Sequence, residues 1–327
     1  MDSSSVRASI IATLFATLAL ASAQAVAAKP GGGGSTDPCA TPKLDFPAFA
    51  YWKPAGKGIE ILVADATGKC IRSVIKSTGT GATIQFSYGV NGISNRGRVV
   101  WVAAPAVVGV DFTVDALTNQ ITVFGRKTIY SGTGGFISLS KDGSALYSTR
   151  YPGSGGPVID RVSLDATGSA TKTALVLQAP TDSNVQTISV SGEGIGTVLF
   201  ADYKPISGAA TNQLVWILLD SPDYDNEIGT DNLGREFTPA ADTAPLSNRV
   251  AYTKFVGGCD ALFTSDLNGV SVPPDQTAYG LKPTWVNGNI VADGRTATCD
   301  YSGTIMQTNP TSGEQVALTR GYDPDGK

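Results

Sequence analysis

The sequence predicts an all-β protein, a six-bladed β-propeller with about four antiparallel strands in each blade. The first observation is a polar turn that returns every 43 to 55 residues, at positions 65, 115, 165, 220, 266 and 309. A fixed period of this length is typical of repeat folds, in which each unit buries its apolar face against its neighbours. The second observation is that the apolar runs are short, rich in Val, Ile, Tyr, Phe and Thr, and broken by Gly, Asn, Asp and Pro. That composition favours strands and turns.

The amino-terminal end predicts export. Residues 1–28 read as a signal peptide, in which Arg7 precedes an uncharged apolar stretch and small residues follow. The stretch is shorter than the roughly 20 residues of a membrane span. Residues 29–43 include Gly31–Gly34 and are expected to form a flexible leader. We expect residues 44–327 to form a single propeller domain, monomeric and not membrane-spanning, in the periplasm or outside the cell.

The repeats define the elements in order. The first contains the apolar runs Phe49–Trp52, Ile59–Val63 and Cys70–Ile75. The third opens with Ile137–Tyr147, in which a Ser-Lys-Asp-Gly turn separates two strands and predicts a hairpin. The repeated aspartates are predicted to be structural, because Asp at a turn bonds its own backbone. They are Asp65, Asp115, Asp165 and Asp266.

Four cysteines in an exported chain indicate disulfides, with three possible pairings. We favour Cys39 with Cys70 and Cys259 with Cys299, because each pair lies within one repeat or neighbouring repeats. A metal site is a poor alternative, since the cysteines are not in close pairs and the chain has no histidine.

The run Leu139–Tyr147 resembles the Ser-Pro-Asp-Gly-Lys motif of TolB-like, WD40-like (PD40-type) propeller repeats. The hydrophobic-Asp-x-x-Gly turn before the last strand is similar to theirs as well. The resemblance implies a periplasmic or secreted propeller that binds another protein. The separate amino-terminal domain of TolB has no room here, because the repeats begin near Leu44.

The absence of histidine excludes a Ser-His-Asp or Cys-His nucleophile. Paired carboxylates could still hydrolyse glycosides. Candidate carboxylates for this chemistry cluster in one acidic loop. The same loop could also be interpreted as a calcium site, but its acidic residues do not have the spacing of an EF-hand. We expect it to be a solvated loop, with no cofactor and no metal. Its residues are Asp220, Asp223, Asp225, Glu227, Asp231 and Glu236.

A net charge of −4 argues against a nucleic-acid partner. Instead, cations and aromatics follow an early strand of most repeats, and equivalent loops of a propeller emerge on one face. This set is predicted to bind an envelope or extracellular partner, either an acidic peptide, a protein loop or an anionic glycan. The alternative is that the aromatics only cap blade packing. The residues are Trp52, Lys53, Arg150, Tyr151, Tyr203, Lys204, Lys254, Phe255 and Arg295.

The leading hypothesis for function is therefore a non-catalytic binding propeller. The alternative is a secreted carbohydrate-active hydrolase or lyase that uses carboxylates at the channel mouth. A purely structural repeat protein is a third possibility.

Overall fold

The computed structural model describes residues 37–78, 83–132, 135–181, 183–190, 198–205, 212–218, 221–231, 240–241, 249–266, 271–295 and 298–326. The predicted signal peptide lies outside these residues. One compact unit spans Asp37–Lys327. Within the described residues the elements are strands, apart from one 3-10 turn at Val90–Gly92. No helix in this part of the chain is long and apolar enough to cross a membrane.

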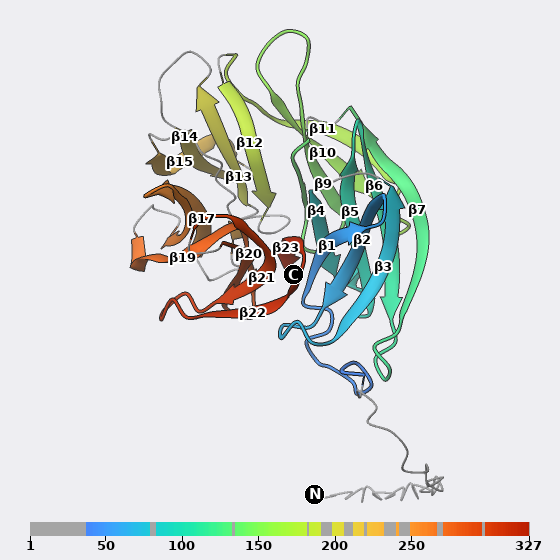
Figure 1. Cartoon of the computed structure of the whole chain (residues 1–327). Coiled ribbons are helices and arrows are strands. Elements are labelled where there is room, and N and C mark those ends of the chain that lie inside the picture. Colours follow the sequence, from blue (N-terminus) through green and yellow to red (C-terminus); the bar gives the residue numbers. More distant parts are fainter. Residues whose placement is uncertain are drawn as a thin grey trace, which may run out of the picture. The chain divides into compact units, whose positions relative to one another are not determined.

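Four of the sheets have four antiparallel strands each (Figure 1). The first contains, in spatial order, β23 (Tyr322–Gly326), β1 (Phe49–Ala55), β2 (Gly58–Ala64) and β3 (Ile71–Thr78). The second contains β4 (Ile84–Tyr88), β5 (Arg96–Ala103), β6 (Ala106–Val114) and β7 (Ile121–Ser131). The third contains β8 (Ile137–Leu139), β9 (Ala145–Arg150), β10 (Val158–Leu164) and β11 (Ala170–Gln178). The fourth contains β12 (Ser183–Val190), β13 (Val198–Pro205), β14 (Asn212–Leu218) and β15 (Ser221–Asp231).

The remaining sheet has seven strands, because one long strand belongs to two groups of four. β19 (Ser271–Val286) pairs with β18 through Ser271–Tyr279 and with β20 through Gly280–Val286. The predicted all-β class and four-strand unit are confirmed, and the count of six blades remains a prediction. The other strands are β16 (Ala240–Ala241), β17 (Arg249–Val256), β18 (Cys259–Asp266), β20 (Asn289–Arg295), β21 (Tyr301–Thr308) and β22 (Gln315–Arg320).

The sheets pack face to face, so a strand can be buried on both sides. In β1, Phe49 and Tyr51 join a cluster with Val286 of the seven-stranded sheet. Ala50, between them, joins a cluster with Phe86 of the second sheet. Because successive side chains of a strand point to opposite faces, the apolar sequence of β1 supplies two cores at once.

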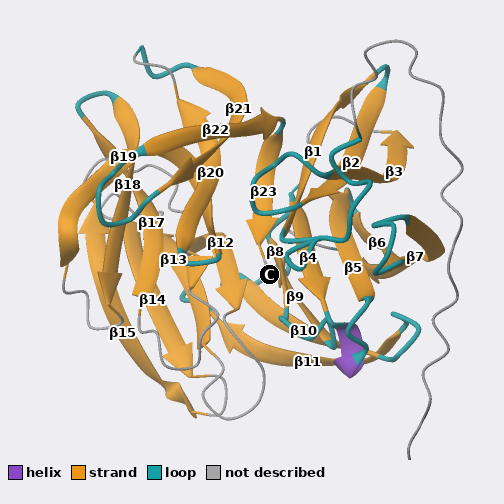
Figure 2. Ribbon diagram, turned by 90° about the horizontal axis from the view of Figure 1, so that it is seen from below, coloured by secondary structure: helices purple, strands orange, loops and turns teal. Residues whose placement is uncertain are grey.

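The succession of sheets closes on itself through the carboxyl-terminal strand (Figure 2). β23 pairs antiparallel with β1 and also packs against β4, β19 and β20. The first sheet thus takes one strand from the end of the chain and three from the beginning. The sequence analysis did not predict this closure, because it assigned each sheet to one repeat.

Side chains of one sheet satisfy the free edge of the next. The first strand of a sheet has a sheet partner on one side only, so its remaining backbone N–H groups need other acceptors. They bond to side chains of the preceding sheet. The bonds run from Gly326 N to Thr284 Oγ1 (2.8 Å), Ile84 N to Asp323 Oδ2 (3.0 Å), Phe86 N to Asp325 Oδ2 (2.5 Å), Leu139 N to Gln85 Oε1 (3.3 Å) and Val190 N to Ser138 Oγ (3.0 Å).

The repeated aspartates form the predicted turns. Asp65 Oδ1 accepts the Lys69 N–H at 2.9 Å, and Asp165 Oδ1 accepts the Ser169 N–H at the same distance. Asp115 Oδ1 accepts the Leu117 N–H at 2.8 Å. Their structural role is confirmed at these three positions, and the side chain of Asp266 lies outside the described part.

A buried arginine joins the second and third sheets. Arg98, 1% exposed, bonds Asp111 Oδ1 through Nε at 2.7 Å and Asp111 Oδ2 through Nη2 at 3.1 Å. It also donates to the carbonyls of Gly143 and Asp165, which belong to turns of the third sheet. Gly168 packs against this guanidinium, where an added Cβ would lie 2.9 Å from Nη2.

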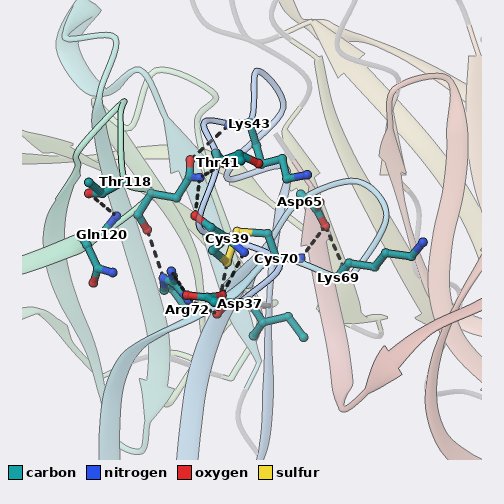
Figure 3. Close-up of a disulfide and its surroundings, with 12 residues drawn as sticks. Asp37, Cys39, Thr41, Lys43, Asp65, Lys69, Cys70, Arg72, Thr118 and Gln120 are labelled. Atoms are coloured by element: carbon teal, nitrogen blue, oxygen red, sulfur yellow. Dashed lines mark hydrogen bonds and ion pairs between the residues drawn. A yellow bond between two sulfur atoms is a disulfide. The ribbon is translucent and has the colours of Figure 1, made fainter. Parts of the chain in front are cut away.

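Both predicted disulfides are present, Cys39–Cys70 and Cys259–Cys299. The first fastens the segment before β1 to the turn that precedes β3 (Figure 3). Arg72 and Asp37 form an ion pair beside it at 2.8 Å. Buried Asn119 donates through Nδ2 to the carbonyls of Cys39 (3.0 Å) and Thr41 (2.7 Å). Residues from Asp37 onward are therefore held against the first two sheets.

Candidate functional site

The nine predicted binding residues lie at one end of equivalent strands. We call this end the hairpin face. It carries the loops that connect the second strand of each four-strand group to the third. Trp52 and Lys53 are near the end of β1, Arg150 ends β9, and Arg295 ends β20. Tyr203 and Lys204 are near the end of β13, Lys254 and Phe255 near the end of β17, and Tyr151 follows β9. Chain topology therefore places all nine at matching positions.

On the first sheet, the aromatic and the cation have partners within the sheet. Trp52 stacks on Tyr322 of β23, with ring centroids 4.9 Å apart. Lys53 Nζ lies 3.3 Å from Glu60 Oε2, and the two residues are direct cross-strand partners in β1 and β2. The Lys53 side chain stays 43% exposed. The side chain is accessible to a binding partner, but Glu60 already compensates its charge.

On the third sheet, Arg150 and the neighbouring Tyr130 of β7 converge on one carboxylate. Arg150 Nε lies 2.8 Å and the Tyr130 hydroxyl 2.7 Å from Asp160 Oδ2. Burial and the Asp160 charge raise the pKa of Tyr130 to about 12, so this phenol remains a proton donor at neutral pH. Tyr151, 46% exposed, donates its hydroxyl proton to the Val185 carbonyl at 2.8 Å and thereby ties this hairpin to β12.

In the seven-stranded sheet, two hairpins are joined covalently. The Cys259–Cys299 disulfide links the β17–β18 hairpin to the segment between β20 and β21. Arg295 forms an ion pair with Asp260 beside it. Lys254 Nζ lies over the Tyr252 ring, 5.5 Å from its centroid. This part of the hairpin face is fixed before any partner arrives.

The side chains of Tyr203, Lys204 and Phe255 lie outside the described part of the structure, as do those of the predicted acidic loop. The expectation of a loop is wrong over Ser221–Asp231, where the backbone forms β15 and pairs with β14. Among the described residues no group of three potential ligands could hold a metal ion.

The structure also brings together three carboxylates that the sequence analysis missed. Asp323 and Asp325 lie on β23 and bond the N–H groups of Ile84 and Phe86 in β4. Asp293 of β20 accepts the Asp323 N–H through Oδ1 at 2.7 Å. Lys282 of β19 forms an ion pair with Asp323 at 2.9 Å.

Two of these carboxyl groups have strongly raised pKa values. Burial raises the pKa of Asp293 to about 7, with a further contribution from the Asp323 charge. Burial likewise raises the pKa of Asp325 to about 7, against the opposing influence of Lys141 and of the Phe86 N–H. Asp325 keeps partial solvent exposure, whereas Asp293 is 5% exposed.

A short motif could have revealed this cluster. Gly280-Leu281-Lys282-Pro283 and Gly321-Tyr322-Asp323-Pro324 share a Gly-apolar-charged-Pro pattern, and both begin a strand segment next to the closure. Lys282 and Asp323 have positive φ values of 53° and 54°, and the strand register shifts at both sites. Such bulges redirect a side chain out of the regular alternation. A Cβ at Gly321 would lie 2.3 Å from the Tyr51 ring, so the glycine is required there.

Comparison with solved structures identifies the fold. TolB from Acinetobacter baumannii superposes with a TM-score of 0.61 at 14% identity, over 87% of this chain and 67% of that one. A chain of the nidogen/laminin complex superposes with a TM-score of 0.53 at 11% identity, over 85% of this chain and 97% of that one. The fold is a β-propeller. No family model matches the sequence, and no curated protein matches it. At these identities the likeness establishes the propeller and leaves its function open.

Proposed function

We propose that this propeller is an exported, non-catalytic binding protein that contacts a protein partner through its hairpin face. The observation that carries the proposal is the covalent link between two hairpins on that face, Cys259–Cys299. A surface fixed in advance loses less conformational entropy on binding. The disulfides also agree with an oxidising compartment.

The exposed side chains of the hairpin face have the composition of interfaces. Tyr151 and the Arg150 side chain are 46% and 41% exposed, and the Lys53 side chain is 43% exposed. Arginine and tyrosine are enriched at protein interfaces and among the residues that dominate binding energy. Because Lys53 and Arg150 are paired with carboxylates, we expect a partner of mixed charge rather than a polyanion.

A second candidate function is glycoside hydrolysis at the carboxylate cluster, favoured by the two raised pKa values. Asp323 and Asp325 hold N–H groups two residues apart on β4, a spacing of about 6.7 Å. Glycosidases place their two carboxyl groups about 5 to 9.5 Å apart, one of them protonated at neutral pH. We favour binding because each of these carboxylates already accepts a backbone N–H that β4 or β23 needs.

The test is capture of a partner by residues 29–327 from an envelope extract, with identification by mass spectrometry. The variant replaces four cations of the hairpin face by Ser, namely Lys53, Arg150, Lys204 and Lys254. A control replaces two cations away from that face, Lys69 just before β3 and Lys172 near the start of β11. The same partner should bind the wild type and the control and be lost by the variant. Equal capture by all three proteins would refute the proposed surface.

The second candidate has its own assay. Asp323→Asn and Asp325→Asn should each abolish any glycosidase activity of the wild type. If the wild type releases no reducing sugar from a panel of neutral and acidic oligosaccharides, hydrolysis is refuted and the binding proposal is unaffected.

A further inference from the structure

Three carboxylates, two of them buried, gather at the point at which the propeller closes. We call the contacts of β23 with β4, β19 and β20 the closing seam. Asp323 and Asp325 hold β23 to the free edge of β4 by bonds of 3.0 and 2.5 Å. Asp293 holds β20 to the backbone of β23 at 2.7 Å. Three of the polar bonds across the seam therefore depend on carboxyl oxygens.

The seam contains equal numbers of acidic and basic side chains, but each basic side chain also has a partner other than Asp293 and Asp325. Lys282 is paired with Asp323 at 2.9 Å, and Arg295, which is paired with Asp260, also acts on Asp293. Lys141 reaches the Gly326 carbonyl at 3.5 Å and influences Asp325 from the β8–β9 turn. The charged groups that face the cluster among the described residues are Asp293, Asp323, Asp325, Lys141, Lys282 and Arg295.

Hydrogen bonding alone does not require these carboxyl groups to be ionised. A neutral carboxylic acid still accepts an N–H bond through its carbonyl oxygen. Ionising Asp293 would place a second negative charge beside Asp323 in a 5% exposed site, against the opposing influence of Lys282 and Arg295. A neutral Asp293 thus keeps its bond across the seam and avoids that second charge, and a neutral Asp325 likewise keeps its bond to the Phe86 N–H.

We propose that the closing seam is proton-dependent, tight when Asp293 and Asp325 carry protons and loosened when they lose them. The change would free β23 from β4 and β20 while the rest of each sheet stays paired. It would also reach the hairpin face, because Tyr322, next to Asp323, stacks on Trp52. Protonation or deprotonation at the seam would thus change the packing of Trp52, one of the predicted binding residues.

The direction of the effect follows from linkage. Both carboxyl groups have a folded pKa of about 7, raised from 3.8. The closed seam therefore binds more protons than the open one between about pH 4 and pH 7, and its stability falls as pH rises through that window. Above the folded pKa both forms are ionised and the dependence levels off.

Few other side chains of this protein change their protonation state in this pH window. The chain contains no histidine. Side chains with ordinary pKa values therefore titrate mainly below pH 5 or above pH 7. A transition in that range reports carboxyl groups with raised pKa values.

The test measures amide hydrogen exchange of the peptide containing β23, expressed as protection factors at pH 5, 6, 7 and 8. Wild-type protection should fall by up to about tenfold per pH unit for each carboxyl group between pH 5 and pH 7, and then level off. The double variant Asp293→Asn, Asp325→Asn should be flat, because Asn keeps the acceptor oxygen but does not ionise. Asp142→Asn is the control and should keep the wild-type slope, because the pKa of Asp142 is lowered.

Two results would overturn the proposal. One is wild-type protection that does not change between pH 5 and pH 7. The other is a fall of equal size in the double variant. If the double variant does not fold, the two single variants decide the matter, because each should lose about half of the wild-type slope in log protection.

Discussion

Replacing Arg98 by Met should destabilise the propeller more than any surface change, because Arg98 connects the second and third sheets from a buried site. Arg98 is 1% exposed and bonds Asp111 with two nitrogens, at 2.7 and 3.1 Å. Removing one partner of a buried ion pair costs about 3 to 5 kcal/mol, because the other charge stays buried. Arg96 still neutralises Asp111 in the variant. We therefore expect the lower end of that range, about 3 kcal/mol.

The measurement is urea unfolding followed by tryptophan fluorescence, in a double-mutant cycle with Asp111→Leu. The two single variants should each lose about 3 kcal/mol, and the double variant should lose at least about 2 kcal/mol less than their sum. Arg126→Met is the control, because Arg126 is exposed and lies over the Trp101 ring at 5.6 Å from its centroid. Its change should stay within about 0.5 kcal/mol. A coupling energy between Arg98 and Asp111 below about 0.5 kcal/mol would refute the reasoning.

Three further predictions concern turns and the disulfide. Gly168→Ala should cost at least about 1 kcal/mol in urea unfolding, because its φ is +78° and the new Cβ would lie 2.9 Å from Arg98. Cys39→Ser with Cys70→Ser should lower stability by about 3 to 4 kcal/mol for a closed loop of 31 residues, and an unchanged melting temperature would contradict this. Burial raises the pKa of Asp142, but hydrogen bonds within its turn outweigh that effect and lower it overall. Its contribution should therefore be lost as pH falls below about 4, and Asp142→Asn should show a shallower acid transition between pH 4 and pH 2.

Local chemistry explains what the sequence could predict. The turns at Asp65 and Asp165 close through bonds to N–H groups within five residues, so one repeat contains all the information that they need. The same holds for the hairpin positions of the binding residues, which follow from strand order. The pair Lys53–Glu60 is also local, since the two residues face each other across one hairpin, but the sequence analysis did not pair them.

Long-range contacts explain what it could not predict. Asp323 bonds the N–H of Ile84, 239 residues away along the chain, and no periodic pattern marks the two as neighbours. The raised pKa values of Asp293 and Asp325 follow from that closure, because burial at the seam is their main cause. The compensation of Arg295 by Asp260 likewise joins two repeats. The sequence shows where the cations are, but it does not show which acids from other repeats pair with them in the fold.

The position of β23 has a consequence for biogenesis. β1 emerges early in synthesis, but its partner on one edge is β23, Tyr322–Gly326, which is synthesised much later. A nascent polypeptide lacking those residues leaves that edge of β1 without its native partner, and exposed strand edges promote aggregation. The first sheet can be completed only after Tyr322–Gly326 have been synthesised. In the exported protein that we propose, this delay would help to keep the chain unfolded until it has crossed the membrane.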